Sequence, residues 1–495
     1  MTKYILSLLA IVMGAMAAKA ALAVTPSAAG SLPALIGNPA EVTDLTVTGP
    51  VNAYDLDFID THMPQLLRLD LSGATIEAGN GRRLRGISYH PAGRIPARIF
   101  TGSPVRELLL PDAGYITVGD GAFAGSAIES ISVRANVKDM GNGAFSGCTA
   151  LKTVTLAVGT VGESAFAGCT ALESVTLTAP VAVADYAFAD CSSLTAVDGA
   201  SNITSIGRRA FANCAALAGF SFGSGLTDIG DEAFLAAGLR EADLTPCKAL
   251  DGIGEWAFAH MPRLESLDLG KASWIGRGIV FDCPRLNNLN FPNEADTVPD
   301  LAYAKNTALD TTGIMHDEVT YIGDHAMHGM SQVTTFTLPA SLEYIGDGAM
   351  EGMTSLQRIN ISATTPPATG EDVWNGLDQP KIVLQVPDAG ADSYRAADQW
   401  RNFAIYSVSG IDDVLDDTAG ESLRARFEGD RLVVESAGLD LIRVSLYNVG
   451  GLLLDSAEAP AGRAEFDTAG SADRVYLIGA VMADGRSASL KIAKN

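Results

Sequence analysis

Residues 161–177, VGESAFAGCTALESVTL, decide the fold, because close copies of this stretch recur along most of the 495-residue chain. When the copies are aligned on Phe166, an apolar residue appears at twelve positions that lie 21 to 24 residues apart. These positions are Phe100, Phe123, Phe145, Phe166, Phe188, Phe211, Phe234, Phe258, Val280, Tyr303, Met327 and Met350. Twelve copies in phase predict a repeat architecture in which each copy forms one structural unit.

Each repeat has two halves with different expected conformations. The Val-x-Leu half, as in Val175 and Leu177, alternates with a period of two and is typical of a short strand with apolar side chains turned inward. The Gly-x-x-Ala-Phe half is too short for a free helix, so we expect one helical turn on the opposite side of the coil. A period near 23 with the pattern Leu-x-x-Val-x-Leu is that of a leucine-rich solenoid. We therefore predict an α/β-type repeat solenoid, with repeats over residues 89–362 and caps over residues 24–88 and 363–406.

Two internal columns should hold the coils together, because a single coil cannot bury its apolar face alone. One column is the aromatic position, and the other is the slot three residues later. The predicted core residues are Phe123, Phe145, Phe166, Phe188, Phe211, Phe234, Phe258, Cys148, Cys169, Cys191 and Cys214. The cysteine slot holds Ala237 or Met261 in other repeats, so we interpret its thiols as free, small hydrophobic groups rather than disulfide partners. Cys247 lies outside this column, at a position open to exposure.

Polar residues flank the inward Val-x-Leu pair and should face solvent on the strand side. We call this row the polar ladder. Its candidate binding residues are Ser130, Ser132, Thr153, Thr155, Ser174, Thr176, Asp198, Ser221, Glu241, Asp243, Asp268, Asn288 and Asn290. The row is hydroxylic in its first half and acidic or amide toward its middle, and it contains no aromatic residue. Because Thr and Ser also favour exposed strands for structural reasons, a row that binds nothing tightly is the alternative.

The two ends of the chain differ from the repeats. Residues 1–23 contain Lys3, an apolar run too short to span a bilayer, and two possible cleavage motifs, Ala18-Lys19-Ala20 and Ala21-Leu22-Ala23, which together predict a secretory signal peptide. No later apolar run is long enough to predict a transmembrane segment. Residues 407–422 are interpreted as an acidic linker, and the short alternating runs of residues 423–495 as a small all-β sandwich. Turns are expected at residues 428–430 and 483–486.

Two resemblances add to this interpretation. Residues 42–406 resemble the BspA-like leucine-rich repeat family of bacterial surface proteins, in the repeat, in the opening strands at residues 42–49 and 67–72, and in the closing segments ATTPP (363–367) and YRAADQWRNF (394–403). The segments VSLYNVGG (444–451), VYLI (475–478) and KIAK (491–494) resemble the C-terminal sorting domain of the type IX secretion system. That resemblance implies passage through secretion machinery to the outer surface of a Gram-negative bacterium. An immunoglobulin-like stabilising domain is the alternative for residues 423–495.

Composition and motifs argue against several classes of function. The chain has 34 basic and 58 acidic residues, a formal charge of −24, so nucleic acid and anionic membranes are poor partners. No nucleophile or metalloprotease motif appears, so we predict no enzyme and no cofactor. His316, His325 and His328, with Asp317, Glu318 and Asp324 nearby, could suggest a metal site. His325 and His328 fall at variable repeat positions, so we expect solvated residues instead. We expect the same of Asp412, Asp413, Asp416 and Asp417, since no calcium loop surrounds them.

The predicted function is binding at a surface. We expect an adhesin whose polar ladder attaches the protein to a host extracellular protein or to another cell, as the resemblance to BspA-like proteins implies. A glycan-binding protein for nutrient capture is the first alternative, which exposed aromatic clusters would favour. A structural coat component without a specific ligand is the second.

Overall fold

The computed structural model describes residues 20–79, 89–292, 295–309, 314–408, 423–436, 441–448, 453–459, 462–468, 475–482 and 487–494. The chain divides into two compact units, Met1–Leu384 with Tyr394–Ala404, and Gln385–Ser393 with Ile405–Asn495. Most of the expected acidic linker, including its four aspartates, lies outside the described residues.

A cap opens the first unit. It contains β1 (Ala20–Val24), η1 (Leu32–Leu35), η2 (Pro39–Glu41), β2 (Val42–Val47), β3 (Gly49–Val51), α2 (Ala53–His62), β4 (Arg68–Asp70) and β5 (Ala74–Ile76). Asn52 and Asp55 form a reciprocal capping box at the start of α2. Asp55 is fully buried, and it also accepts hydrogen bonds from the backbone N–H groups of Gly30 (2.6 Å) and Leu32 (3.0 Å). One carboxylate thus joins the entering chain to the helix.

Strand β1 overlaps the predicted signal peptide. It pairs in parallel with β2, with Ala21 opposite Asp44 and Val24 opposite Val47. Cleavage after Ala23 would remove nearly all of β1, whereas cleavage after Ala20 leaves residues 21–24 in the sheet.

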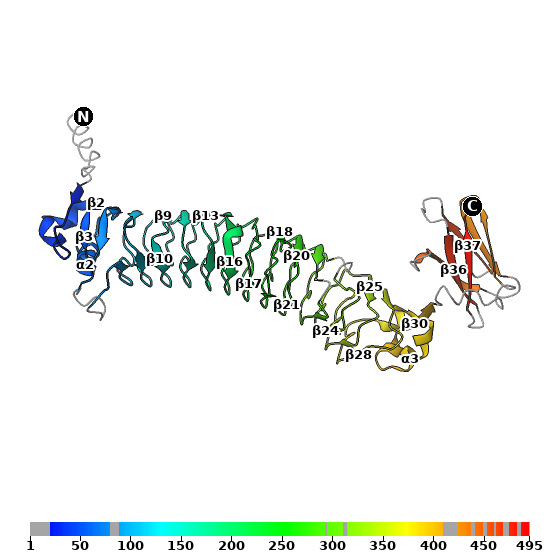
Figure 1. Ribbon diagram of the computed structural model, residues 1–495. Helices are drawn as coiled ribbons and strands as arrows, with labels where there is room; N and C mark the ends of the chain where they lie inside the picture. The colour runs from blue at the N-terminus through cyan, green and yellow to red at the C-terminus, as the bar shows by residue number, and fades with distance from the viewer. Residues whose placement is uncertain are drawn as a thin grey trace, which may run out of the picture. The chain divides into compact units, whose positions relative to one another are not determined.

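Most coils contribute one strand to each of two series of parallel sheets that run along the solenoid (Figure 1). The first sheet series continues from β2 and β4 through β7 (Glu107–Leu109), β9 (Ser130–Val133), β11 (Thr153–Leu156), β13 (Ser174–Leu177) and β15 (Ala196–Asp198), then β18 (Glu241–Asp243), β20 (Ser266–Asp268) and β22 (Asn288–Asn290), then β25 (Thr335–Leu338), β27 (Arg358–Ile361), β29 (Val383–Pro387) and β30 (Ala404–Val408). The second series contains β6 (Arg94–Ile95), β8 (Ile116–Val118) and β10 (Val137–Met140), then β12 (Thr160–Val161), β14 (Val181–Val183), β16 (Ile203–Ile206), β17 (Asp228–Ile229), β19 (Gly252–Ile253) and β21 (Trp274–Ile275), then β23 (Thr297–Val298), β24 (Tyr321–Ile322), β26 (Tyr344–Ile345) and β28 (Ala368–Thr369). The repeat solenoid predicted from the sequence is confirmed, with a second strand per coil that the repeat pattern did not reveal.

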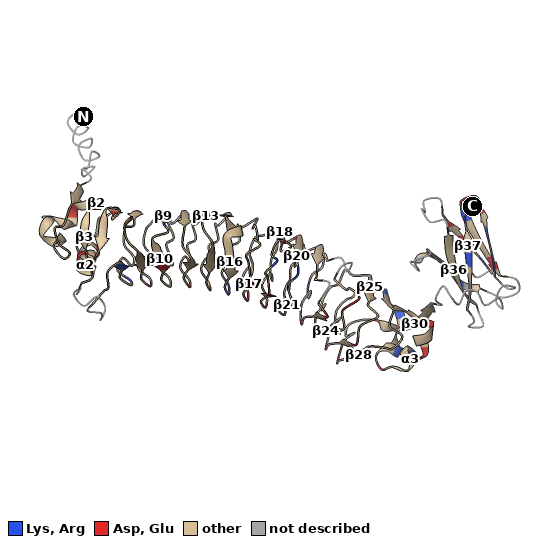
Figure 2. Cartoon of the chain, viewed as in Figure 1, with Lys and Arg blue, Asp and Glu red and all other residues tan. Residues whose placement is uncertain are grey.

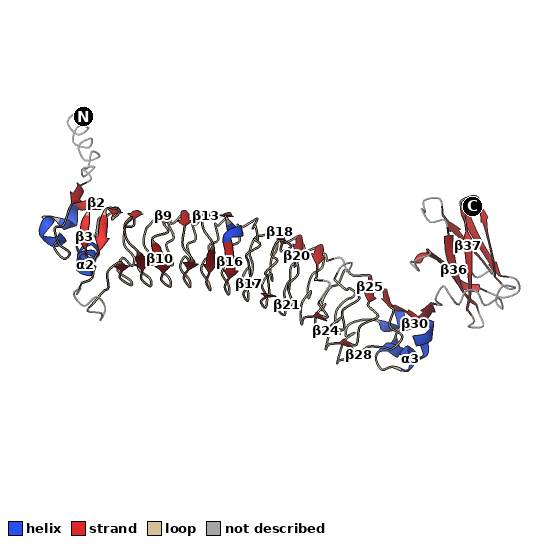
Figure 3. Ribbon diagram, in the orientation of Figure 1, coloured by secondary structure: helices blue, strands red, loops and turns tan. Residues whose placement is uncertain are grey.

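The Gly-x-x-Ala-Phe half corrects one detail of the prediction, because it forms linked turns rather than a helical turn. In the coil of Phe166, alternate N–H groups bond within the coil, as from Ala165 to the carbonyl of Gly162 (3.1 Å). The intervening groups donate to the next coil, as from Phe166 to the carbonyl of Ala187 (2.8 Å). A helix would keep all these bonds within its own segment, whereas this arrangement uses half of them to join neighbouring coils. In Figure 3, helical segments accordingly lie in the two caps, apart from η3 (Ala200–Asn202).

The phenylalanines form one internal stack. From Phe100 to Phe258, the rings of successive coils lie 5.2–5.4 Å apart, with interplanar angles of 3–11°. The side chains of the stack are almost completely buried. Because ring centroids at this spacing gain contact energy beyond simple burial, the stack fixes the phase of one coil on the next.

The C-terminal cap contains η4 (Gln379–Lys381), η5 (Asp388–Gly390), α3 (Ala391–Ala396) and η6 (Trp400–Asn402). Trp400 packs edge-on against Trp374 and Tyr394, with centroids 5.2 and 5.4 Å apart. Its indole N–H donates to the carbonyl of Pro367 (2.9 Å), and the Tyr394 hydroxyl donates to that of Ala363 (3.0 Å). The aromatic cluster closes the end of the apolar core and satisfies carbonyls that a further coil would otherwise bond.

The C-terminal residues form the small all-β sandwich predicted. One antiparallel sheet holds β31 (Leu423–Glu428), β32 (Arg431–Ser436) and β35 (Arg463–Asp467); the other holds β34 (Leu453–Glu458), β33 (Leu441–Asn448), β36 (Val475–Met482) and β37 (Ser487–Ala493). Leu432, Val434, Phe466, Tyr476 and Ile478 pack between the sheets. Strand β35 was not predicted from the sequence, because only Ala464 and Phe466 show its alternation. The turn expected at residues 483–486 lies outside the described residues.

Candidate functional site

The polar ladder lies on the outward face of the first sheet series. Thr153 pairs with Ser130 on one side and with Ser174 on the other, and Thr155 likewise with Ser132 and Thr176. Neighbouring strands in such a sheet are about 4.8 Å apart, so the hydroxyl groups form two regular rows. Strands β9, β11 and β13 carry no charged residue, and Figure 2 shows this part of the face uncoloured.

All thirteen candidate binding residues of the ladder are accessible to solvent. Ser130, Ser132, Thr153, Asp198, Ser221, Glu241, Asp243, Asn288 and Asn290 are exposed, whereas Thr155, Ser174, Thr176 and Asp268 are half-exposed. Apolar neighbours such as Val154 and Leu156 are buried, so a partner that contacts this face would meet mainly polar side chains.

An acidic band crosses the ladder at β18 and β20, where Asp243 pairs with Asp268. Asp243 accepts a hydrogen bond from the backbone N–H of Thr245 (2.9 Å), and the hydrogen bonding from Thr245 lowers the pKa of Asp243. Asp268 accepts bonds from the backbone N–H of Gly270 (2.8 Å) and from the side-chain amide of Asn290 (2.8 Å). These bonds hold the carboxylates in fixed positions while leaving Asp243 exposed.

The ladder is interrupted, which the sequence analysis did not anticipate. Between β15 and β18, residues 219–222 form no strand, although Ser221 keeps its exposed position. Phe220 and Phe222 pack edge-on against Phe234, with centroids 5.1 and 5.6 Å away. Phe220 and Phe222 replace the usual Val-x-Leu pair at the point where the strand pairing is lost.

Arg68 is a ladder residue that the sequence analysis missed. It lies on β4 and forms ion pairs with Asp44 (3.2 Å), Asp70 (2.9 Å) and Glu107 (3.0 Å), which belong to three successive strands. The hydrogen bond to Glu107 is the main cause that raises the pKa of Arg68. Asp70 lies on the same strand as Arg68, Asp44 on the strand before it, and Glu107 on the strand after it. Aligning these strands in the sequence could therefore have predicted the ion pairs.

All six cysteines are free thiols and buried. Each column cysteine donates its S–H to the carbonyl of the aromatic residue in the preceding coil, as from Cys169 to Phe145 (3.2 Å) and from Cys283 to Phe258 (3.1 Å). Asn306 occupies the same slot and donates its amide to Val280 (2.8 Å), so the slot serves a carbonyl as well as filling space. Cys247 is 2% exposed, which corrects the expectation that it was open to exposure.

A recurring aspartate three residues before the core position has a structural role. Asp231 accepts a bond from the backbone N–H of Glu255 (2.9 Å), and Asp324 does the same for Asp347 (2.9 Å). Each carboxylate therefore joins its coil to the next. This accounts for Asp324, which the sequence placed near the histidines.

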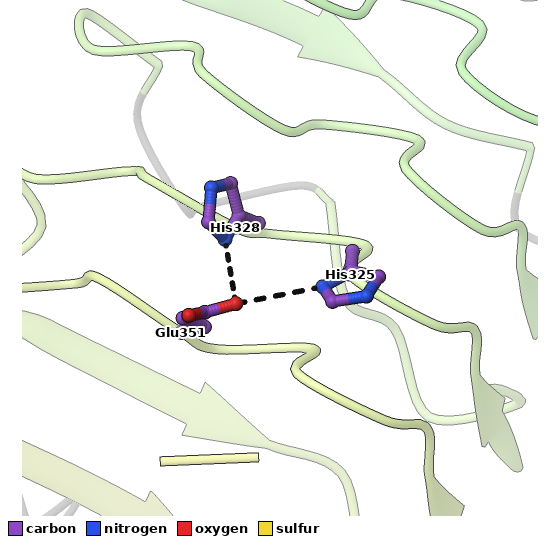
Figure 4. Close-up of side chains that lie close together, drawn as sticks. All are labelled: His325, His328 and Glu351. Carbon is purple, nitrogen blue, oxygen red and sulfur yellow. Dashed lines mark ion pairs between the residues drawn. The ribbon is translucent and has the colours of Figure 1, made fainter. Parts of the chain in front are cut away.

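The histidines do not act as one group. His325 and His328 converge on Glu351 of the next coil (Figure 4), whereas the His316 ring lies 6.5 Å from that of Phe291. Glu351 Oε2 is 3.7 Å from His325 Nδ1 and 3.2 Å from His328 Nδ1. Sequence reasoning missed Glu351, although it occupies the same repeat position as His328, one coil later.

Two exposed aromatic residues, Trp274 and Tyr321, lie on strands of the second sheet series. Trp274 is 55% and Tyr321 38% exposed, and Tyr321 stacks on Tyr344 with centroids 5.2 Å apart and an interplanar angle of 17°. Each tyrosine therefore turns one ring face toward the other. The exposed edges of two stacked rings give a sugar ring a smaller stacking surface than an open ring face would.

Comparison with known proteins identifies the repeats. A family model described as BspA type leucine-rich repeat region matches in six copies over residues 91–195, 181–310 and 306–369. This chain belongs to the BspA-type leucine-rich repeat family. None of the curated proteins matches it. Within the part of the chain that the structure describes, there is no helix with the length and apolar character needed to cross a membrane.

Two solved structures show related architecture. A leucine-rich repeat protein from Bacteroides ovatus is 19% identical, with a TM-score of 0.50, over 79% of this chain and 92% of that one. A leucine-rich cell surface protein from Faecalibacterium prausnitzii is 20% identical, with a TM-score of 0.29, over 56% of this chain and 84% of that one. At these identities the likeness to the Bacteroides ovatus protein supports the fold alone.

Proposed function

We propose that this chain is a non-enzymatic adhesin, displayed on the outer surface of a Gram-negative bacterium, that attaches to host extracellular proteins or to other cells. The observation that carries the proposal is the polar ladder, in which exposed Ser, Thr, Asp and Asn side chains repeat in register along successive strands. Membership of a repeat family built from stacked coils supports a binding role over a catalytic one.

The ladder supplies many weak contacts rather than a few strong ones. High-affinity interfaces are usually anchored by Trp, Tyr or Arg. The thirteen candidate binding residues include none of these, and the guanidinium of Arg68 is already held by three acids of its own face. Individual hydrogen bonds at an exposed face contribute about 0.5–1.5 kcal/mol. Attachment would therefore depend on many copies displayed on one surface, which raises the effective concentration of the second and later contacts.

We also propose that residues 423–495 direct export through type IX secretion machinery. Their antiparallel sandwich has its own apolar core and belongs to the second compact unit of the chain. Deleting residues 423–495 should leave the repeats folded but retain them inside the cell. If the truncated protein reaches the surface as well as the full chain does, the domain has only a stabilising role.

The adhesion proposal is tested with beads coated with the full chain at graded densities. The beads are offered to host matrix proteins, host cells and other bacteria, and a glycan array is probed in parallel. We expect adhesion to proteins or cells that falls more steeply than the coating density, and no array signal. Glycan binding without adhesion would instead support a glycan-binding protein for nutrient capture. If beads at full coating density bind nothing, a structural coat component without a specific ligand is the better interpretation.

A further inference from the structure

We propose that His325, His328 and Glu351 form a binding site for a divalent transition-metal ion, with Zn²⁺ as the best fit. One ligand atom from each residue lies within 4.8 Å of the other two. The site combines two imidazoles from one coil with a carboxylate from the next (Figure 4). It is separate from the polar ladder, so it goes beyond the adhesive function proposed above.

The repeat register creates this arrangement. His325 lies two residues before the core residue Met327 and has a φ of 52°, and His328 directly follows Met327. Glu351 follows Met350, which is the next residue in the core column. Stacking the two coils therefore brings Glu351 beside both histidines without any special loop.

Two neighbours shape the site. The side-chain amide of Asn375, one coil further on, donates to Glu351 Oε1 (2.8 Å), which leaves Oε2 turned toward the histidines. Gly348 lies beneath His325, where a Cβ would collide with the imidazole and lie 3.4 Å from Glu351 Oε2. Orientation of a ligand carboxylate by a second residue is a regular feature of metal sites.

His328 Nδ1 provides an independent indication. This atom is shielded from solvent and makes no hydrogen bond with any described residue, although Glu351 Oε2 is 3.2 Å away. A buried polar atom without a partner costs about 1–3 kcal/mol. A metal ion bound between the imidazole nitrogen and the carboxylate oxygen would satisfy both atoms.

The ligand set selects the ion. Imidazole nitrogen favours zinc and related transition metals, whereas calcium and magnesium prefer oxygen ligands. Zinc bonds of about 2.0–2.2 Å place the ligands of a tetrahedron about 3.3–3.5 Å apart. The observed separations of 3.7 and 3.2 Å from Glu351 Oε2 are close to this, and the imidazole nitrogens, which lie within 4.8 Å of each other, would complete the site by moving toward a shared ion. Three protein ligands leave a fourth position for water or for a ligand from a partner.

The test is isothermal titration of the full chain, free of any histidine tag, with ZnCl₂. We expect one Zn²⁺ per chain with a Kd of about 1 µM or lower. His328→Ala and Glu351→Gln should each weaken binding at least tenfold. Asn375→Ala should weaken it to a smaller extent, because this residue only orients the carboxylate. Circular dichroism checks that each variant remains folded.

His260→Gln is the matched control. His260 Nδ1 lies 3.1 Å from Asp282 Oδ2 in a corresponding pair on other coils, but among the described residues no third metal-binding side chain joins this pair. This variant should bind Zn²⁺ as the unchanged chain does. The proposal is wrong if the unchanged chain binds no Zn²⁺ up to about 1 mM, or if His328→Ala binds it as tightly as His260→Gln does.

Discussion

At the scale of single residues, two backbone positions per coil set the shape of the turn. The residues two before and two after each core residue take left-handed conformations, as at Ser164 (φ 53°) and Gly168 (φ 71°) around Phe166. Glycine adopts this conformation without steric cost, whereas other residues are strained by about 1–2 kcal/mol. Several coils nevertheless carry larger residues there, including Trp256 and Leu301. At these positions a residue other than glycine lowers the free energy of unfolding, compared with glycine at the same place.

Ala236→Gly should stabilise the solenoid, because Ala236 has a φ of 56° and the change removes only one methyl group. We expect a gain of about 0.5–1 kcal/mol in the free energy of unfolding, measured by urea denaturation. Ala167→Gly is the control, since that turn residue is absent from the left-handed positions and should lose about 0.5–1 kcal/mol. Equal effects of the two changes would contradict the strain argument.

The buried thiols predict a loss of stability at alkaline pH. Burial is the main cause that raises the pKa of Cys191 and of Cys283 to about 12, against 9.0 for a free thiol. Because the pKa of each thiol is higher in the folded state than in the unfolded state, the free energy of unfolding is highest below pH 9 and falls as the pH rises toward 12. The free energy of unfolding should fall by about 1 kcal/mol per pH unit for each such thiol in that window.

Thermal unfolding between pH 8 and 11 measures this slope, and Cys283→Ala should make it shallower. At pH 8 the native chain should leave a thiol reagent unreacted, whereas the denatured, unreduced chain should show six thiols. A slope that Cys283→Ala leaves unchanged would show that this thiol does not ionise on unfolding.

At the scale of the elements, the contacts between coils decide stability. No strand of the second sheet series is longer than four residues, so each is too short to hold its neighbours by its own pairing. The turn hydrogen bonds and the recurring aspartates supply the remaining connections. Asp231, which accepts from the N–H of Glu255 (2.9 Å), is a representative example.

Asp231→Ala should destabilise the solenoid by about 0.5–1.5 kcal/mol, because it removes the hydrogen bond from the N–H of Glu255 that joins the two coils. Asp228→Ala is the control: this exposed residue points outward from β17, and its loss should cost less than about 0.5 kcal/mol. Urea unfolding of the two variants compares them directly. If both variants unfold at the same urea concentration, the aspartate does not join the coils.

The elements also show how far the sequence could be read. The twelve-fold phase predicted the stacked phenylalanines and the first strand of each coil, because those features depend on apolar spacing alone. The second strand is two to four residues long, with one or two inward side chains, which leaves no periodicity to detect. Glu351 was missed for a different reason. Its contact with His328 depends on which exposed side chains of neighbouring coils lie next to each other, and the apolar spacing carries no information about that.

At the scale of the whole molecule, the repeats convert a short sequence pattern into a long, regular face. The position of this face follows from the fold, which the sequence did predict. The binding partner of the face cannot be predicted in the same way, because the repeat pattern reports only on core packing. The acidic band at β18 and β20, with Asp198 on β15 before it, is its most distinctive part. It brings negative charge to a face whose preceding strands β9, β11 and β13 carry none. Reversing this charge should disturb a partner that contacts the ladder. Because Asp243 and Asp268 also accept backbone hydrogen bonds, circular dichroism must first show that the changed chain keeps its fold.

The most direct measurement compares the adhesion of beads that carry two charge-matched variants. One has Asp198, Asp243 and Asp268 changed to lysine on the ladder, and the other has Asp139, Asp228 and Glu343 changed to lysine at exposed positions in or next to the second sheet series. Both alter the net charge equally. We predict that the ladder variant loses most of its adhesion to host proteins or cells while the second variant keeps it. Equal adhesion by the two variants would show that the polar ladder is not the binding face.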